Sequence, residues 1–486
     1  MRDVKTVRGP HAVALALFGL VWFSCVWFGS WEFNPNNATR LFAAIAIVER
    51  GETRIDRYQS LTIDKAQFGE HFYMDKAPGM TLMALPVVWG FKAATGGDTR
   101  DYVIDVTNPK LGRFMAVRQR VAVALGVAIL TAFASVLLLD LATGITGSPA
   151  AGTFAALGYA MGSIVWGWST TLFGHAPVAA LLLIATWAIW RGTSTVRDFG
   201  RWHYPVMAGA ALGWAVVIEF PAALGGVAIG LWALWRAWGH PAAQRWRVLG
   251  VAVGVAVVTV LPLFAYNIAA FGTPFRLGYS GVVGFNGMQQ GLFGLTYPKP
   301  DALFGILLGT RRGLLWCSPV ILLGAWGLVQ LIRDRVTRDL GVLCAMLVVI
   351  VVTVNASYVY WDGGASMGPR HAVPAIPFLA IGLARVWAQW SGRWARAGLM
   401  GLMAVSMLLN FAIASTDVFA SEAYDNPVWD LTIRTMVPLG LFRTLPNDFW
   451  GWPGWRGILL YLVVALPALW VILRWTRDAE AKLSAS

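Results

Sequence analysis

The stretch VLGVAVGVAVVTVLPLFAYNIAA, residues 248–270, holds no charged side chain and is long enough to cross a bilayer as one helix. Arg245 and Arg247 stand directly before it, as expected at the cytoplasmic end of a span. The whole chain shares this character: 57% of its residues are hydrophobic, only 13% are charged, and its mean hydropathy is +0.60. An average soluble domain has about 25% charged residues. The sequence therefore predicts an all-α polytopic membrane protein.

Similar apolar segments recur on both sides of this stretch. We expect about twelve transmembrane helices of roughly 20 residues each, in a single transmembrane domain that covers residues 1–486. The expected spans are 11–31, 118–140, 149–166, 176–191, 205–220, 221–237, 248–270, 313–332, 340–358, 372–388, 397–416 and 456–473.

Positive charges set the expected orientation of these spans. If the N-terminal segment with Arg2, Lys5 and Arg8 is cytoplasmic, every second connection carries arginines, and only 141–148 lacks a positive charge. This pattern explains the net charge of +13, so we expect no nucleic-acid partner. We expect a bacterial inner-membrane protein with both termini in the cytoplasm. The connections on the periplasmic side are then 32–117, 167–175, 219–221, 271–312, 359–371 and 417–455.

The first of these loops, 32–117, is expected to contain two interfacial helices. Residues 37–49 have apolar side chains at helical spacing, with Asn37 or Thr39 as the cap and Gly51 as the stop. Residues 80–91 form a second apolar segment that follows Pro78-Gly79 and is short for a span. The loop thus places two helices at the outer surface of the membrane.

Between these helices lies the densest group of charges in the chain, residues 54–76. Most of these charges fit an ordinary solvated loop. Asp75-Lys76 differs because it directly precedes an apolar interfacial helix. A lysine ammonium together with the free N–H groups of a helix N-terminus suits a phosphate ligand.

Three further polar positions fall at the outer ends of predicted spans. His175 is either a satisfied polar group or a metal ligand or general acid or base. Glu219 lies between two apolar spans and needs either a structural partner or a functional reason. Asp362 opens the glycine-rich segment 362–371, which ends in Arg370 and His371. We treat His175, Glu219 and Asp362 as candidates for a metal or polar site.

Cations on the periplasmic side point to an anionic ligand. Arg370 would start a late helix and face the same compartment as Lys76, which suits an anionic lipid head group, although an arginine that snorkels from a span end is the alternative. Arg276, Arg311 and Arg312 also face outward, against the general charge trend.

Three segments together resemble the GT-C glycosyltransferases, in particular the protein O-mannosyltransferase and lipid A aminoarabinose transferase group. The segments are Asn37-Ala38-Thr39-Arg40-Leu41, Asp75-Lys76-Ala77-Pro78-Gly79 and Arg370-His371-Ala372-Val373-Pro374-Ala375-Ile376-Pro377. The resemblance covers the order of elements through most of the chain. In that group an acidic residue stands near the start of the first interfacial helix, where this chain has Asn37.

The resemblance implies transfer of a sugar from a polyprenyl-phosphate carrier to an extracytoplasmic glycan, lipid or protein acceptor. Asn37 cannot act as a base, so the catalytic carboxylate would be Asp56, Asp64 or Asp75. Arg40, Lys76, Arg370 and His371 would bind the donor phosphate. The resemblance leaves open a divalent metal ion, with Asp75, His175 or Glu219 as ligands.

Two other functions remain open on sequence grounds. A transporter or flippase would place ionisable residues at the centres of several spans, which here are almost free of charge. A non-catalytic protein that binds the carrier lipid would explain Asn37.

Overall fold

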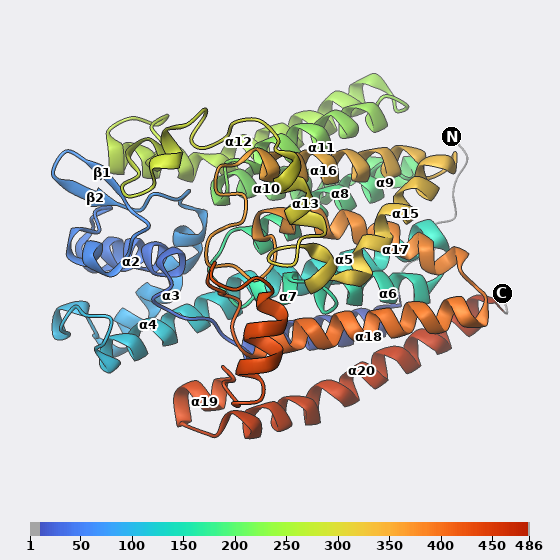
Figure 1. Ribbon diagram of the computed structural model, residues 1–486. Helices are drawn as coiled ribbons and strands as arrows, with labels where there is room; N and C mark the ends of the chain where they lie inside the picture. The colour runs from blue at the N-terminus through green and yellow to red at the C-terminus, as the bar shows by residue number, and fades with distance from the viewer. Residues whose placement is uncertain (1–9, 485–486) are drawn as a thin grey trace.

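The computed structural model describes residues 10–484. The protein is a bundle of helices that run roughly parallel to one long axis (Figure 1). The helices of the first half are α1 (His11–Trp27), α2 (Pro35–Arg50), α3 (Gly79–Thr95), α4 (Pro109–Ala122), α5 (Ala128–Thr146), α6 (Pro149–Ala160), α7 (Val165–Trp168), α8 (His175–Gly192), α9 (Val196–Phe199), α10 (His203–Ile218) and α11 (Ala222–Ala237). Those of the second half are α12 (Ala242–Phe271), α13 (Pro300–Leu307), α14 (Leu314–Cys317), α15 (Pro319–Arg333), α16 (Arg338–Ser357), α17 (Ile376–Gln389), α18 (Arg393–Ser415), α19 (Leu445–Trp450) and α20 (Gly454–Ser484).

Every predicted span overlaps at least one helix of the described chain. By length and composition, six helical stretches are able to cross a bilayer: Pro109–Thr146, Ala242–Phe271, Arg338–Ser357, Arg370–Gln389, Arg393–Ser415 and Gly454–Leu483. Shorter apolar helices, among them α1, α10, α11 and α15, coincide with other predicted spans. The all-α polytopic architecture is confirmed, whereas the number twelve stays a prediction.

The predicted span 149–166 is wrong as a continuous helix, and 313–332 is also interrupted, at Ser318 between α14 and α15. Helix α6 ends at Ala160, and the chain turns before the single turn of α7. The Ser163 hydroxyl donates to Tyr159 O, and the Ser318 hydroxyl accepts from Ile164 N. These side chains satisfy backbone groups that leave the helical pattern, so an uncharged apolar run bends here inside the protein.

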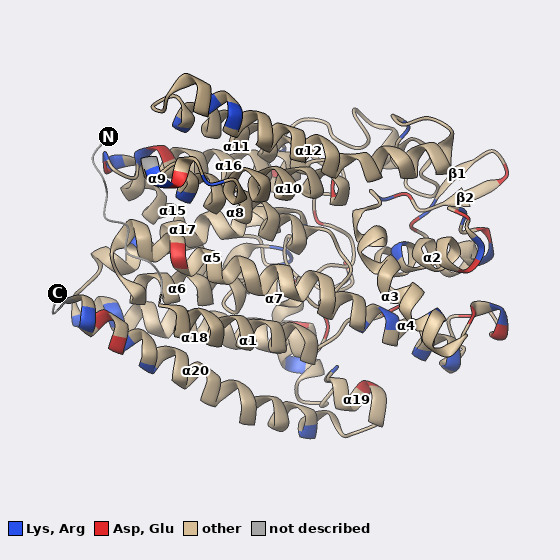
Figure 2. Cartoon of the chain, turned by 180° about the vertical axis from the view of Figure 1, so that it is seen from behind, with Lys and Arg blue, Asp and Glu red and all other residues tan. Residues whose placement is uncertain are grey.

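The two ends of the bundle differ in structure. Helix α9 and the end of α20 lie at one end, while α2, α3, the β-strands and α19 lie at the other (Figure 1). Most of the charged residues lie towards these two ends, and few lie in the middle of the bundle (Figure 2). The predicted N-terminal charges Arg2, Lys5 and Arg8 lie outside the described residues, and the side of the membrane that each end faces stays a prediction.

Small side chains set the closest helix contacts in the bundle. Helices α15 and α17 touch along their backbones, because a Cβ at Gly324 would collide with Leu379 O and one at Gly327 with Gly382 O. Helix α10 packs between α8 and α12 in a similar way, with Gly209 against the backbone of Ala252. Small residues permit such close approach in membrane bundles, where van der Waals packing replaces the hydrophobic effect as the driving force.

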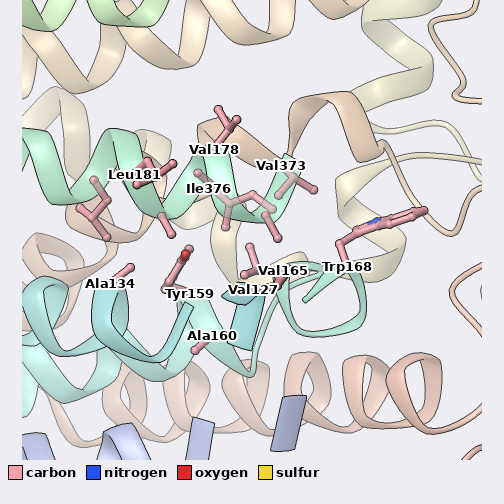
Figure 3. Packing of buried hydrophobic residues seen from close by; sticks show 14 of the residues in the cluster. Val127, Ala134, Tyr159, Ala160, Val165, Trp168, Val178, Leu181, Val373 and Ile376 are labelled. Atoms are coloured by element: carbon pink, nitrogen blue, oxygen red, sulfur yellow. The ribbon is translucent and has the colours of Figure 1, made fainter. Parts of the chain in front are cut away.

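The core lies where α5, α6, α8 and α17 meet. Figure 3 shows Tyr159 from α6, Leu181 from α8 and Ile376 from α17 among its buried side chains. This core fixes the outer ends of α8 and α17, which carry His175 and Arg370 close to them.

The loop at residues 32–117 forms two helices and a small hairpin. Helix α2 begins at Pro35, two residues before the predicted start, and its cap is Asn34 rather than Asn37 or Thr39: the Asn34 side chain accepts from Asn36 N. Proline at the first helical position needs no hydrogen bond for its nitrogen, so the pair Asn34-Pro35 sets the start. The helix ends at Gly51 as predicted, with φ = 69°. Residues 36–46 are buried by protein, so α2 is more enclosed than a simple interfacial helix.

Strands β1 (Ala66–Phe68) and β2 (His71–Tyr73) form the antiparallel hairpin between α2 and α3. Ala66 pairs with Tyr73 and Phe68 with His71. Val282 also bridges to Ala66, and Val283 N donates to Lys65 O at 3.1 Å. The 271–312 loop therefore lies against the hairpin and covers the residues between it and the bundle.

Asp417, which lies just after the end of α18, leads to a prediction of how the stability of the protein depends on pH. Its side chain accepts from Phe419 N at 2.9 Å, and burial raises the pKa of Asp417 to about 6, above its ordinary value of 3.8. Because the folded state holds this proton more tightly than the unfolded state, the stabilisation is complete below about pH 4 and is lost as the pH rises through about 6. Between those values we expect the wild type to lose about 1–3 kcal/mol more unfolding free energy than Asp417→Asn. Denaturant titrations in detergent at several pH values measure this difference, and equal pH slopes would contradict it.

Candidate functional site

A cavity of about 320 Å³ lies at the end of the bundle that carries α2, α3 and the hairpin. Parts of the chain far apart in sequence form its wall. It is lined by Asn34, Pro35, Asn36, Arg40, Ile63, Asp64, Asp75, Lys76, His175, Glu219, Tyr279, Val282, Phe285, Met288, Tyr358, Tyr360, Gly363, Gly364, Ala365, Arg370, His371 and Glu422.

Most of the residues that the sequence singled out meet in this cavity. Eight of the ten line its wall: Arg40, Asp64, Asp75, Lys76, His175, Glu219, Arg370 and His371. Asp56 and Asp362 do not line it. These eight residues are three cations, three carboxylates and two histidines, and Glu422 adds a fourth carboxylate to the wall.

Lys76 lies between two carboxylates just before α3. Its Nζ is 2.7 Å from Asp75 Oδ2 and 3.5 Å from Asp64 Oδ2. Burial raises the pKa of Asp75, although the Lys76 ammonium opposes this shift. Burial lowers the pKa of Lys76, but the two carboxylates outweigh it and the net shift is upward. The Lys76 side chain therefore stays a cation in the cavity.

Arg40, on α2, forms the second charged group. Its side chain is 1% exposed, and its Nη2 is 3.0 Å from Glu219 Oε1. Glu219 lies in the turn between α10 and α11, pressed against Gly174, where a Cβ would collide with the carboxylate. The structural partner anticipated for Glu219 is thus Arg40, which also lies 5.8 Å from the ring centre of Phe173.

Arg370 differs from the other two cations of the cavity. It opens the 3₁₀ turn Arg370–Ala375 that leads into α17, and its guanidinium lies 5.0 Å from the ring centre of Phe173. No carboxylate among the described residues forms an ion pair with it, and its buried Nε lacks a hydrogen-bond partner there. Gly363, with φ = 76°, makes room for it, because a Cβ would lie 2.9 Å from Arg370 Nε. Arg370 is partly buried, and a partly buried cation without an ion-pair partner is costly unless an anion joins it.

The rings of two histidines, His175 and His371, contact each other in the cavity that also holds Arg370. The rings of His175 and His371 are 4.8 Å apart in an edge-to-face arrangement, and Tyr358 lies 5.5 Å from His371. In the described part of the chain, no three or more His, Cys, Asp or Glu side chains are grouped to hold a metal ion. Asp75, His175 and Glu219 thus share the cavity without forming a ligand set.

Asp56 and Asp362 have other partners. Asp56 is half-exposed; its Oδ2 is 2.8 Å from His71 Nδ1, and its Oδ1 accepts from Phe72 N at 2.6 Å. It fastens β2 to the segment that precedes the hairpin. Asp362 accepts from Arg311 at 2.8 Å and from Gly364 N at 3.3 Å, and it does not line the cavity.

Asn37 is fully buried and has a structural role. Its Oδ1 accepts from Leu172 N at 3.0 Å, and its Nδ2 donates to Trp31 O at 2.9 Å. It joins the start of α2 to the segment before α8. The Asn37 amide thus makes hydrogen bonds through both its oxygen and its nitrogen, and it does not line the cavity.

Sequence reasoning missed several cavity residues. Asn34 and Asn36 line it from the start of α2, and Tyr279, Tyr358, Tyr360 and Glu422 line it from later loops. Burial raises the pKa of Tyr279, so its phenol stays a hydrogen-bond donor. The pattern Tyr358-Val359-Tyr360, next to the glycine-rich turn, was a usable signal; no local pattern marked Glu422.

The bundle and its charged cavity define a polytopic helical membrane protein with a polar site at one end. Residues 112–264 match the family model described as "Dolichyl-phosphate-mannose-protein mannosyltransferase". The chain also resembles ArnT from Cupriavidus metallidurans, in a crystal structure with undecaprenyl phosphate bound: the TM-score is 0.51 at 15% identity, covering 97% of this chain and 73% of that one. The apo structure of the same protein gives 0.47 at 16% identity, covering 98% and 72%.

No curated protein matches the chain by sequence. The chain therefore has the fold of a GT-C membrane glycosyltransferase, which is the fold that the resemblance predicts.

Proposed function

We propose that this protein transfers a sugar from a polyprenyl-phosphate carrier to an acceptor outside the cytoplasm. The observation that carries the proposal is Arg370, a cation without an ion-pair partner among the described residues, in a cavity that also holds Lys76 and Arg40. The ArnT structure with bound undecaprenyl phosphate supports a lipid phosphate as the anion that joins it. The inner membrane of a bacterium, with the cavity on the periplasmic side, is the matching location.

The charged side chains of the cavity are suited to both parts of the transfer reaction: proton uptake from the acceptor and stabilisation of the departing phosphate. A carboxylate accepts the proton of the acceptor hydroxyl, whose oxygen then bonds to the anomeric carbon. The bond from that carbon to the phosphate oxygen breaks, and its electron pair stays on the phosphate. Lys76 and Arg370 stabilise the negative charge that develops there.

Between the two carboxylates beside Lys76, we assign the proton transfer to Asp64. Its side chain is 11% exposed, against 2% for Asp75, and its contact with Lys76 is longer. Asp75 is hydrogen-bonded to Lys76 and orients the ammonium. Asp56 lies outside the cavity lining, so we do not retain it as a candidate base.

Binding of the carrier tests the proposal directly. We expect the purified protein in nanodiscs to bind undecaprenyl phosphate saturably and undecaprenol, which lacks the phosphate, much more weakly. Lys76→Ala and Arg370→Ala should each weaken the binding at least about tenfold, since a hydrogen bond to a charged group contributes roughly 1.5–3 kcal/mol.

Lys110→Ala is the matched control, because Lys110 is an exposed lysine of the same outer loop outside the cavity lining. It should bind like the wild type. Equal binding of the phosphate and the alcohol, or full binding by both cavity variants, would overturn the proposal.

A further inference from the structure

A second pocket, of about 310 Å³, lies on the other side of the turn that bounds the main cavity. Helix α13 and the segment that follows it form one wall, and Trp361 forms the other. Phe304, Leu308 and Thr310 line it together with Arg311 and Arg312. It therefore combines an apolar wall with two cations.

Most N–H donors of the Arg311 guanidinium are available to a ligand. Its Nη2 donates to Asp362 Oδ2 at 2.8 Å, and no other side-chain hydrogen bond of Arg311 is present among the described residues. A guanidinium carries five N–H donors in a fixed fork, so most of them are available to a ligand. The side chain is 38% exposed and thus accessible.

Arg312 adds positive charge without its own carboxylate. It is 1% exposed and donates to three backbone carbonyls: Asp362 O at 3.0 Å, Arg311 O at 3.1 Å and Gly364 O at 2.6 Å. Two arginines thus lie beside the carboxylate of Asp362, and Glu422 is a second carboxylate that acts on Arg312. Arg311 is the residue of the two that keeps donors for a ligand, and a guanidinium favours phosphate and carboxylate groups.

The apolar side of the pocket opens towards the outside of the bundle. Phe304 is 62% exposed and Leu308 47% exposed, and the neighbouring Leu315 and Trp316 are also exposed. In a membrane protein such side chains face lipid tails, and a tryptophan among them is typical of the interface. A ligand with both an anion and an apolar tail matches the two walls at once.

Only a short turn separates this pocket from the main cavity. Asp362 pairs with Arg311, while Gly363 and Gly364 line the cavity. Arg312 holds this turn in place through the carbonyls of Asp362 and Gly364. A molecule bound by Arg311 therefore lies next to the rim of the donor site.

We infer that this pocket binds the anionic head group of a membrane amphiphile, which serves as the acceptor of the transfer. The acceptor role rests on the proposed function; the binding site does not. The head group, a phosphate or carboxylate, contacts Arg311, the tail lies along Phe304 and Leu308, and a hydroxyl reaches the cavity past the turn at residues 362–364.

Short-chain phosphatidylglycerol is the probe, with phosphatidylcholine of the same chain length and inorganic phosphate as comparisons. We expect saturable binding of phosphatidylglycerol by the detergent-purified full chain, measured by native mass spectrometry. Arg311→Gln should weaken it about tenfold. Arg276→Gln, which removes an exposed arginine of the same loop outside the pocket, should not change it.

Each other outcome overturns the inference. Equal binding of both lipids, unaffected by Arg311→Gln, would mean apolar contact only. Inorganic phosphate that binds as tightly as the lipid and depends equally on Arg311 would mean a site for a free anion.

Measuring the binding of undecaprenyl phosphate to the same variants distinguishes a failure of this inference from a failure of the proposed function. Arg311→Gln should leave that binding unchanged, and saturating phosphatidylglycerol should not displace the carrier lipid. Competition between the two would place both lipids in one site and overturn the inference. Loss of carrier binding in Arg370→Ala tests only the proposed function.

Discussion

Asp64→Asn is expected to lower the rate of sugar transfer by about 10²–10⁴-fold, the usual contribution of a positioned general base. The amide keeps the shape of the side chain but cannot take up the proton of the acceptor hydroxyl. Binding of undecaprenyl phosphate should survive, because Asp75 still holds Lys76 at 2.7 Å. Single-turnover release of the carrier, with a polyprenyl-phosphate sugar that the wild type accepts, measures the rate.

Two parallel variants sharpen this test. Asp75→Asn should weaken carrier binding as well as the rate, because it loosens Lys76. Asp56→Asn should stay within about threefold of the wild-type rate, since Asp56 binds His71 and Phe72 N instead of lining the cavity. A full rate in Asp64→Asn together with a large loss in Asp56→Asn would contradict the assignment.

Glu219→Ala is expected to cost about 3–5 kcal/mol of unfolding free energy, because it leaves the buried Arg40 guanidinium without its carboxylate. The penalty arises from the isolated charge more than from the lost pair. The double variant Arg40→Gln/Glu219→Gln should therefore recover at least half of the loss. Denaturant titrations in detergent measure both values.

Glu422→Ala is the control for this second prediction. Glu422 lines the same cavity, but it is exposed, and no described cation forms an ion pair with it. Its replacement should change stability by less than about 1 kcal/mol. If the double variant were as unstable as Glu219→Ala, the cost would come from packing around Glu219 rather than from Arg40.

Hydropathy predicted the helices well because the number of apolar residues needed to cross a bilayer leaves a strong pattern. It failed at residues 161–164, where Ser163 and Ser318 satisfy the backbone of a bend that carries no charge. It also placed the start of α2 at Asn37, because Asn34, Asn36 and Asn37 are all suitable caps. Only Pro35, at the first helical position, distinguishes between them.

The side of the membrane expected for each loop predicted which residues share the cavity, but it did not predict which of them form ion pairs. Arg40 and Glu219 were assigned to the same side of the membrane from separate segments, and the structure pairs them at 3.0 Å. Asp56 and Asp64 could not be distinguished from sequence, since both lie in one polar loop. The structure distinguishes them, because Asp56 is hydrogen-bonded to β2 of the hairpin and Asp64 lines the cavity. Glu422 enters the cavity from a distant loop without any local pattern.

The glycine contacts between α15 and α17 have a mechanical consequence. With backbone against backbone at Gly324, Gly327 and Gly382, neither helix can slide past the other without a clash, so the two act as one rigid strut. Arg370 lies in the turn at one end of that strut, so we expect it to keep its position when a ligand binds. If the cavity binds a long lipid as proposed, we expect the lipid to exchange past the opposite wall, the 271–312 loop, which is joined to the hairpin by few hydrogen bonds.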